Sequence, residues 1–219
     1  MNTNLIVQFA LSIPKTVYFN LRVFPIKQAL KMPVFVNYRV RIVGHLQKGF
    51  ISVTNVTTGM LKVGFPYLNY PTMHTILKVG GTIFLDKKAT IQDGCEINVG
   101  GVLKLGNNFR CNRGTKIDAK KEVVFGDNVL IAPNCYISDS DGHHILSVSE
   151  NQIVNENKKI SVGNHVWIGR GSYILKGASI GNDCVIGAAS VVNREFVQNN
   201  VIIAGIPGKV VKEKCNWQQ

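Results

Sequence analysis

His143 and His144 stand side by side in a polar loop that we expect at residues 138–160, SDSDGHHILSVSENQIVNENKKI. Histidine can take up and release a proton near neutral pH, so the pair could serve in general acid–base chemistry, or else it is a pair of ordinary surface loop histidines. Asp139 or Asp141 could orient an imidazole ring, although a backbone carbonyl could do the same. A loop of this length inside a compact repeat is usually functional. The elements on either side must therefore position it.

The flanking chain follows a period of six, with an aliphatic residue at every sixth position. A helix has a period of 3.6 residues and a half-buried strand a period of two, so neither explains it. Asn, Asp and Gly follow the aliphatic residues, and these residue types suit tight corners. Where the spacing between two runs of hexads departs from six, we expect inserted residues at a corner. The pattern predicts a parallel β-solenoid with three hexads per coil. The marked residues are Val79, Leu85, Ile91, Ile97, Leu105, Cys111, Ile117, Val123, Phe125, Ile131 and Ile137, and then Val162, Ile168, Ile174, Ile180, Ile186 and Val192.

The composition fits one or two domains with a continuous core, since the chain has 219 residues of which 45% are hydrophobic. The longest early apolar run, LIVQFALSI, is shorter than the ~20 residues of a membrane span, and no basic segment precedes it as in a secretory signal. We therefore expect a cytoplasmic protein. The five cysteines are widely spaced and odd in number, which favours buried thiols over disulfides. They are Cys95, Cys111, Cys135, Cys184 and Cys215.

Charge is concentrated at the start of the chain. Through Leu85 there is no Asp or Glu, and nine Lys and Arg residues supply +9 of the net +12. This asymmetry indicates an anionic partner, either a membrane surface or a phosphorylated glycan precursor, or else a solvated basic face. No nucleic acid partner is expected, because no basic-aromatic recognition motif accompanies the charge.

The first residues lack the hexad. Pro14, Pro25 and Pro33 interrupt residues 12–36 and predict a short cap of extended pieces with one helical turn. We expect a basic cap at residues 1–50, the solenoid at 51–212 and a tail at 213–219.

Four motifs carry a family resemblance: GDNVLIAPNCYISDSDGHH, ISVGNHVWIG, IGNDCVIGAASVV and AGIPGKVVK. Over residues 80–212 the chain resembles the hexapeptide-repeat acetyltransferases, in the sugar O-acetyltransferase branch with the galactoside and maltose enzymes. The resemblance implies homotrimers of left-handed parallel β-helices without a catalytic metal. Acetyl-CoA and the acceptor would meet between subunits, and the acceptor would be a capsule, exopolysaccharide or lipopolysaccharide precursor. Handedness comes from the resemblance alone, because parallel crossovers are generally right-handed.

The resemblance assigns the general base to His143. His144 is the alternative, because the loop is one residue longer than in the galactoside enzymes. Asn112 would approach the acetyl and acceptor groups, or else it is a solenoid corner residue. Lys120 stands at the position of an acidic acceptor-binding residue, with Asp118 nearby, so a simple galactoside is not the expected acceptor. Asp118, Asp141 and His144 complete the predicted acceptor site with Asn112.

For coenzyme A the resemblance implies a groove lined by small residues and a cluster of cations. Trp167 would contact the pantetheine or pack on the prism wall. The cations would bind the nucleotide phosphates or form a basic tail. The predicted residues are Trp167, Gly169, Arg170, Gly187, Ala188, Arg194, Lys209 and Lys212.

Two other classes of protein share such solenoids. A zinc-dependent γ-class carbonic anhydrase needs three histidines at a subunit interface. Here His45 and His74 lie outside the clear repeat, and no H-x4-H spacing occurs. A noncatalytic assembly platform would need none of the site residues.

Overall fold

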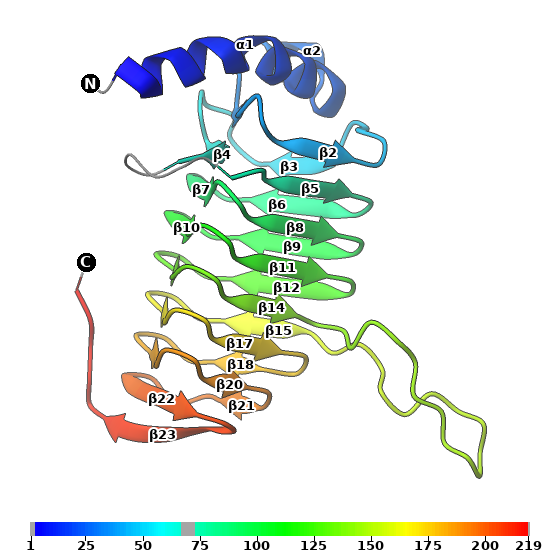
Figure 1. Cartoon of the computed structure of the whole chain (residues 1–219), viewed down its shortest axis with the longest axis vertical. Coiled ribbons are helices and arrows are strands. Elements are labelled where there is room, and N and C mark those ends of the chain that lie inside the picture. Colours follow the sequence, from blue (N-terminus) through cyan, green and yellow to red (C-terminus); the bar gives the residue numbers. More distant parts are fainter. Residues whose placement is uncertain (1–2, 67–72, 219) are drawn as a thin grey trace.

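A computed structural model describes residues 3–66 and 73–218 and shows a stack of short strands beneath two helices (Figure 1). Helices α1 (Thr3–Val23) and α2 (Ile26–Ala29) lie across the N-terminal end of the stack. The strands form three sheets, which we call sheets A, B and C. Each coil of the chain contributes one strand to each sheet, so the fold is the parallel β-solenoid that the hexads predict.

Sheet A contains, in spatial order, β1 (Val34–Val36), β4 (Leu61–Phe65), β7 (Ala89–Gln92), β10 (Phe109–Cys111), β13 (Leu130–Ile131), β16 (Trp167–Ile168), β19 (Val185–Ile186), β22 (Val201–Gly205) and β23 (Gly208–Glu213). Sheet B contains β2 (Arg41–Val43), β5 (Ile76–Val79), β8 (Glu96–Val99), β11 (Lys116–Ala119), β14 (Tyr136–Ser138), β17 (Tyr173–Leu175) and β20 (Val191–Val192). Sheet C contains β3 (Ile51–Val53), β6 (Thr82–Leu85), β9 (Val102–Leu105), β12 (Glu122–Phe125), β15 (Ile160–Val162), β18 (Ser179–Ile180) and β21 (Glu195–Phe196). The final strand, β23, is antiparallel to β22.

The strand register explains the broken period. Ile97 pairs with Ile117, so a coil takes 20 residues in the first half of the solenoid. Ile168 pairs with Ile186, so a coil takes 18 residues in the second half. The two extra residues of the early coils lie at the corner between sheets B and C, at 80–81, 100–101 and 120–121. The offsets are therefore corner insertions, as the sequence predicts.

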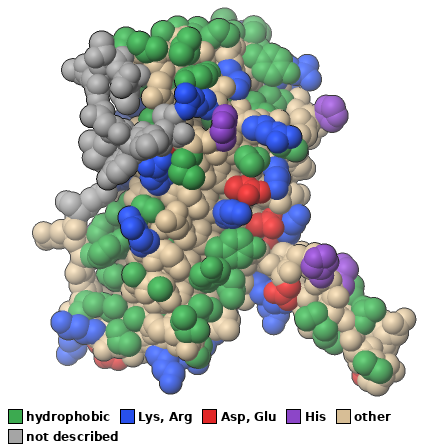
Figure 2. Space-filling view, in the orientation of Figure 1, with side chains coloured by type: hydrophobic (Ala, Val, Ile, Leu, Met, Phe, Trp, Pro, Cys, Tyr) green, Lys and Arg blue, Asp and Glu red, His purple; other side chains and the backbone are tan. Residues whose placement is uncertain are grey.

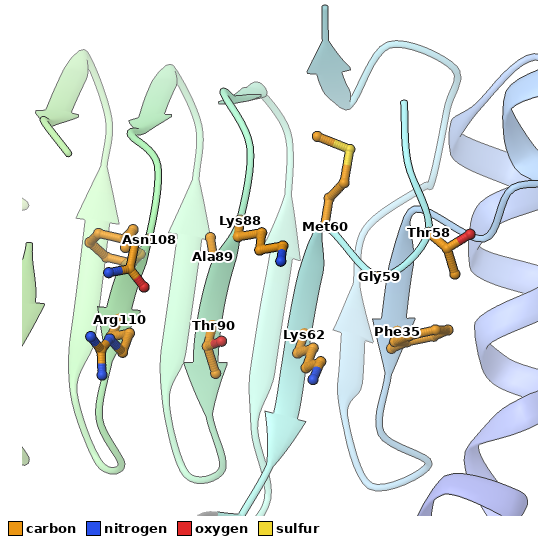
Figure 3. A pocket seen from close by; sticks show the side chains of 11 residues that line it. Phe35, Thr58, Gly59, Met60, Lys62, Lys88, Ala89, Thr90, Asn108 and Arg110 are labelled. Atoms are coloured by element: carbon orange, nitrogen blue, oxygen red, sulfur yellow. The ribbon is translucent and has the colours of Figure 1, made fainter. Parts of the chain in front are cut away.

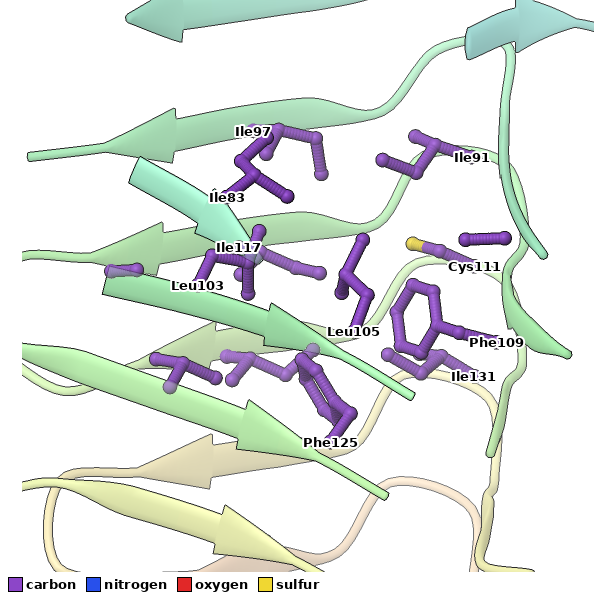
Figure 4. Packing of buried hydrophobic residues seen from close by; sticks show 14 of the residues in the cluster. Ile83, Ile91, Ile97, Leu103, Leu105, Phe109, Cys111, Ile117, Phe125 and Ile131 are labelled. Carbon is purple, nitrogen blue, oxygen red and sulfur yellow. The ribbon is translucent and has the colours of Figure 1, made fainter. Parts of the chain in front are cut away.

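The hexad side chains fill the interior of the prism. The six marked residues from Val162 to Val192 are at most 3% exposed. Figure 4 shows their counterparts in the early coils, where Ile97, Ile117 and Leu105 lie between the sheets. Each coil buries its apolar face only against its neighbours, so the core is continuous along the axis. Four of the five free cysteines are buried in or beside this core, and Cys215 is half-buried.

The N-terminal cap differs from the prediction. Residues 3–23 form one helix with Pro14 inside it, so the expected extended pieces over the first part of residues 12–36 are wrong. The coils begin at Val34, where β1 pairs with β4, and not at residue 51. The helix forms despite Pro14 because its polar side chains bond to the free edge of β1, as described below.

The loop that carries the histidines leaves the prism between β14 and β15 (Figure 1). In the three preceding coils this corner takes only two residues between strands, at 80–81, 100–101 and 120–121. The backbone N–H of Lys158 donates to the carbonyl of Asp139 (3.1 Å) and closes the base of the loop. An antiparallel bridge joins Leu146 to Ile153 further out. The loop is thus a tethered ribbon that projects from the corner between sheets B and C.

Candidate functional site

Asp139 holds the base of the loop. Its carboxylate is buried and accepts the backbone N–H groups of Lys120 (2.8 Å), Lys121 (2.8 Å) and Glu122 (2.7 Å). These groups belong to the corner of the preceding coil. Both carboxylate oxygens are thereby occupied, so Asp139 has a structural role and does not orient an imidazole ring.

Asp141 holds the segment that precedes the histidines. Its carboxylate accepts bonds from the Nζ of Lys176 and the Nδ2 of Asn155. The same Asn155 amide donates to the carbonyl oxygen of His143 (2.8 Å). The ammonium of Lys176 and then the amide of Asn155 lower the pKa of the Asp141 carboxyl. Lys176 and Asn155 were missed in the sequence, although Lys176 directly follows the strand that begins at Tyr173.

The two imidazole rings are exposed on the loop. In the part of the chain that the structure describes, neither ring bonds to Asp139 or Asp141. Four apolar side chains beyond them are also more than half exposed, which is unusual for a tethered loop. They are Ile145 (56%), Leu146 (53%), Val148 (105%) and Val154 (61%).

A second group of predicted residues stacks along the corner between sheets A and B. The N–H of Asn112 donates to Ile131 O (3.0 Å), and the next coils repeat this bond through Ala132, Gly169 and Gly187. Each of these residues follows a sheet A strand, so Asn112, Gly169, Arg170, Gly187 and Ala188 share one edge of the prism. From β10 to β22 this edge spans about 19 Å, at ~4.8 Å per strand. Lys209 pairs with Ala204 at its far end.

Close packing between coils explains why glycine occupies positions 169 and 187 in this corner. A Cβ on Gly169 would lie 2.6 Å from the carbonyl oxygen of Ile186 and 2.7 Å from the amide nitrogen of Ala188. A Cβ on Gly187 would lie 2.8 Å from the Cβ of Ala204. Coil stacking therefore requires glycine here, whether or not a ligand approaches the backbone. Arg170 and Ala188 are the exposed members of the corner.

Trp167 lies on the outer face of sheet A and is 40% exposed. Its ring centroid is 6.1 Å from that of Trp217, which stacks on His165 at 4.5 Å. The indole N–H of Trp217 donates to the carbonyl of His165 (2.8 Å). The tail therefore folds back onto sheet A, a packing role for Trp217 that the sequence did not reveal.

The predicted phosphate-binding cations lie near the C-terminal hairpin. Lys209 and Lys212 are exposed on β23. Arg194 comes from the corner between sheets B and C, and its Nη2 donates to the carbonyl of Gly208 (3.1 Å). Its guanidinium also lies 5.2 Å from the ring centroid of Phe196.

The outer face of sheet B lies between the loop and the corner that carries Asn112. Asp118 lies on this face and accepts a bond from the Nδ2 of Asn98 (3.0 Å). Burial raises the pKa of the Asp118 carboxyl, and the charge of Lys120 opposes this rise. Asn112 follows a sheet A strand at one edge of sheet B, whereas the loop leaves from the other edge. A single chain therefore does not bring the loop base to Asn112.

A basic pocket lies on the outer face of sheet A (Figure 3). Its volume is about 550 Å³, and Lys62, Lys88 and Arg110 line it from three consecutive coils. The ring of Phe35 forms the end nearest the helices (Figure 3). No Asp or Glu is among the lining residues. Arg110 lies on the strand that leads directly to Asn112, so the pocket adjoins the corner described above.

Among residues 3–66 and 73–218, no group of three His, Cys, Asp or Glu side chains is arranged to hold a metal ion. None of the helices in the same ranges is long and apolar enough to cross a membrane.

Comparison with known proteins supports the repeat through a family model and the fold through one solved structure, OatWY. The family described as bacterial transferase hexapeptide (six repeats) matches residues 159–194. The polysialic acid O-acetyltransferase OatWY is similar in structure, with a TM-score of 0.51 and 24% identity over 85% of this chain and 87% of that chain. The polySia-specific acetyltransferase NeuO gives a TM-score of 0.47, with 24% identity over 85% and 74%. A mutant of AntD, an N-acyltransferase from Bacillus cereus, in complex with dTDP and coenzyme A, gives 0.49, with 17% identity over 83% and 80%.

The chain is a parallel β-solenoid in which residues 159–194 match the bacterial transferase hexapeptide (six repeats) model. OatWY and NeuO are acetyltransferases by name, and AntD is an N-acyltransferase by name. No curated protein sequence matches the chain.

Proposed function

We propose that the protein transfers an acetyl group from acetyl-CoA to a hydroxyl of a sugar, on a left-handed β-helix. The observation that carries the proposal is the corner between sheets A and B. It aligns Asn112, Gly169, Gly187 and Lys209 along about 19 Å of the prism edge. An extended pantetheine arm would lie along such an edge, with its acetyl end near Asn112 and its phosphates near the basic hairpin.

The hairpin suits the nucleotide end of acetyl-CoA. Lys209, Lys212 and Arg194 place three cations near the end of the corner, where they would attract the phosphates. Arg194 already donates one bond to Gly208, which fixes the guanidinium beside the hairpin. Lysines supply charge without the bidentate geometry of arginine, so we expect them to contribute mainly through electrostatic attraction.

The general base would come from a second copy of the chain. Asn112 and the loop lie at opposite edges of sheet B, and the apolar side chains of the loop are exposed. Packing these side chains on a neighbouring copy would bury them and carry His143 to the neighbour's Asn112 corner. A homotrimer would form three such sites. The bonds from Lys176 and Asn155 hold the segment before His143 in place for this role.

The reaction would be a direct transfer. The imidazole of His143 accepts the proton of the acceptor hydroxyl while the oxygen attacks the acetyl carbonyl carbon. A bond from a nearby backbone N–H stabilises the developing oxyanion. When the carbon–sulfur bond breaks, the imidazolium returns the proton to the departing thiolate. The products are the acetyl ester and coenzyme A, and no acetyl-enzyme forms.

The acceptor would be an anionic glycan of the capsule, exopolysaccharide or lipopolysaccharide precursor type. The basic pocket supports this choice, because its three cations come from consecutive coils and adjoin Asn112. A carboxylate or phosphate of the acceptor would bind Lys62, Lys88 and Arg110. Asp118 and His144 would contact the sugar from the face of sheet B and from the loop.

A thiol-release assay with anionic glycans tests the reaction. We expect His143→Ala to lower kcat by about 10²–10⁴-fold and His144→Ala to change it far less. Equal turnover in wild type and His143→Ala would exclude His143 as the base. An absence of acetyl-CoA binding would favour a noncatalytic assembly platform instead.

Mixing subunits tests the shared site. His143→Ala and Asn112→Ala are each expected to keep only a small fraction of the wild-type activity when assayed alone. When the two variants are unfolded, mixed and refolded, mixed oligomers form. Some of their interfaces would pair the intact loop of one subunit with the intact Asn112 corner of another, so activity would return. If activity stays low in mixtures that have formed mixed oligomers, the site lies within one chain.

A further inference from the structure

The helix α1 turns its polar side chains toward the solenoid. Gln8, Ser12, Thr16 and Asn20 recur at every fourth position, and the last three are buried. Such a helix normally buries its apolar face and exposes its polar one. In α1 the apolar side chains of Phe19 and Val23 are buried as usual, but Ser12, Thr16 and Asn20 are buried on the same face. Their burial has a cause in the first coil, where β1 would otherwise leave a free edge.

Two of these side chains bond to the backbone of β1, and a third bonds to the backbone just beyond the end of β1. Asn20 donates through Nδ2 to Val34 O (2.7 Å) and accepts from Val34 N–H at Oδ1 (3.1 Å). Thr16 makes the same reciprocal pair with Val36, at 3.2 and 3.0 Å. Ser12 accepts the N–H of Tyr38 (3.0 Å).

The spacing of the polar side chains along α1 matches the spacing of the backbone groups along the edge strand. Four residues of a helix rise about 6 Å and two residues of a strand rise about 6.6 Å, so each polar side chain meets the next outward-bonding residue of the edge. The helix thus replaces the missing neighbouring strand and satisfies backbone groups that would otherwise invite aggregation.

The cost of this arrangement is an apolar outer surface. Figure 2 shows hydrophobic side chains gathered over α1 and α2 at the N-terminal end, with Lys and Arg beside them. The exposed fractions range from 43% to 70%, and nothing in the described part of the chain covers these residues. They are Ile6 (47%), Val7 (53%), Leu11 (54%), Ile13 (59%), Tyr18 (57%), Leu21 (43%), Ile26 (57%) and Leu30 (70%).

Charge decides which partner this surface fits. Arg22, Lys27 and Lys31 are exposed beside the apolar side chains, and no acidic residue occurs before Asp86. A second copy packed through the same face would bring cations against cations. An anionic partner is favoured, and an interfacial helix with apolar and basic side chains is typical of proteins that bind lipid surfaces.

We infer that α1 and α2 form a docking surface for an anionic lipid bilayer, with α1 lying in the plane of the interface. Leu11, Tyr18 and Leu21 would enter the boundary between headgroups and acyl chains, and Arg22, Lys27 and Lys31 would contact lipid phosphates. The solenoid would then stand with its N-terminal end on the membrane. This inference does not depend on the proposed acetyl transfer.

Cosedimentation with vesicles tests the inference. We expect the full chain to bind phosphatidylcholine vesicles that contain phosphatidylglycerol, and to bind pure phosphatidylcholine far less. Leu11→Gln with Leu21→Gln should weaken binding at least about tenfold, because two side chains lose their apolar partition. Arg22→Gln with Lys27→Gln and Lys31→Gln should remove the preference for phosphatidylglycerol and the sensitivity to salt.

The matched control is Val197→Gln with Val211→Gln, which removes two exposed apolar side chains at the opposite end of the solenoid. This variant should bind like the wild type. Circular dichroism should show that all variants keep their strand content, since the changed side chains are exposed. The inference is overturned if wild type does not bind anionic vesicles at low salt, or if the helix variant binds as well as the control. Association without vesicles that the helix variant abolishes would assign the surface to a second copy.

Discussion

Replacing Asp139 with alanine should destabilise the protein by about 3–5 kcal/mol. The carboxylate is fully buried and accepts three backbone N–H groups at 2.7–2.8 Å. A hydrogen bond to a charged group contributes about 1.5–3 kcal/mol, and a buried donor left unpaired costs about 1–3 kcal/mol. The sum is reduced because the corner adjoins the exposed loop, where water can reach some of the freed N–H groups.

The assay is urea unfolding at neutral pH, followed by circular dichroism and at one protein concentration. Asp139→Asn keeps one acceptor oxygen and should fall between wild type and Asp139→Ala. The control is Asp141→Ala, which removes an exposed ion pair to Lys176 and should cost less than about 1 kcal/mol. If Asp139→Ala lies within about 0.5 kcal/mol of wild type, the three bonds do not hold the corner.

Three further predictions concern packing, thiols and the loop. Gly169→Ala should cost about 1–3 kcal/mol because its Cβ would meet Ile186 O at 2.6 Å, whereas Gly100→Ala, with 3.7 Å to its nearest neighbour, should be nearly neutral in the same urea assay. In the native protein only Cys215 should react rapidly with a thiol reagent, because burial raises the pKa of the Cys135 and Cys184 thiols. Fast reaction of several thiols would contradict the packing. The pKa of Asp141 is held below the ordinary ~3.9, so its contribution to loop order is present at neutral pH and is lost as pH falls through this lowered value. Lys176→Met should return the pKa of Asp141 toward its ordinary value in an NMR titration.

The hexads could be assigned from sequence because a solenoid repeats one local environment many times. Ile168 and Ile174 are buried for the same reason as their counterparts two coils away, so spacing alone identifies the inward face. The helix α1 could not be assigned in this way. Its buried face contains Ser12, Thr16 and Asn20, which are ordinarily exposed, and their partners are backbone groups that leave no mark in the sequence.

For the candidate site, too, the sequence predicts some features and only the structure shows others. The interruption of the period located the loop, and the roles of Asp139 and Asp141 then depended on contacts with residues far along the chain, such as Lys176. The motifs named Asn112 and His143 as members of one site. Only the topology shows that Asn112 and the loop lie at opposite edges of sheet B, because sequence distance does not say which corner a residue occupies.

The two proposals together restrict how an acceptor could reach the site. Three strand steps separate β1 from β10, or about 14 Å, and α1 adds about 10 Å, so Asn112 would lie about 24 Å from the bilayer surface. The basic pocket lies on sheet A between these two levels. A lipid-linked glycan would therefore pass the pocket before its hydroxyl reached Asn112, and its anionic groups would meet Lys62 and Arg110 on the way. Because a glycan of one or two sugars would be too short, vesicle-bound acceptors should become substrates only above a threshold length, whereas the same glycans free in solution should show no threshold. Equal activity on short and long vesicle-bound acceptors would contradict the end-on orientation and leave the soluble reaction unaffected.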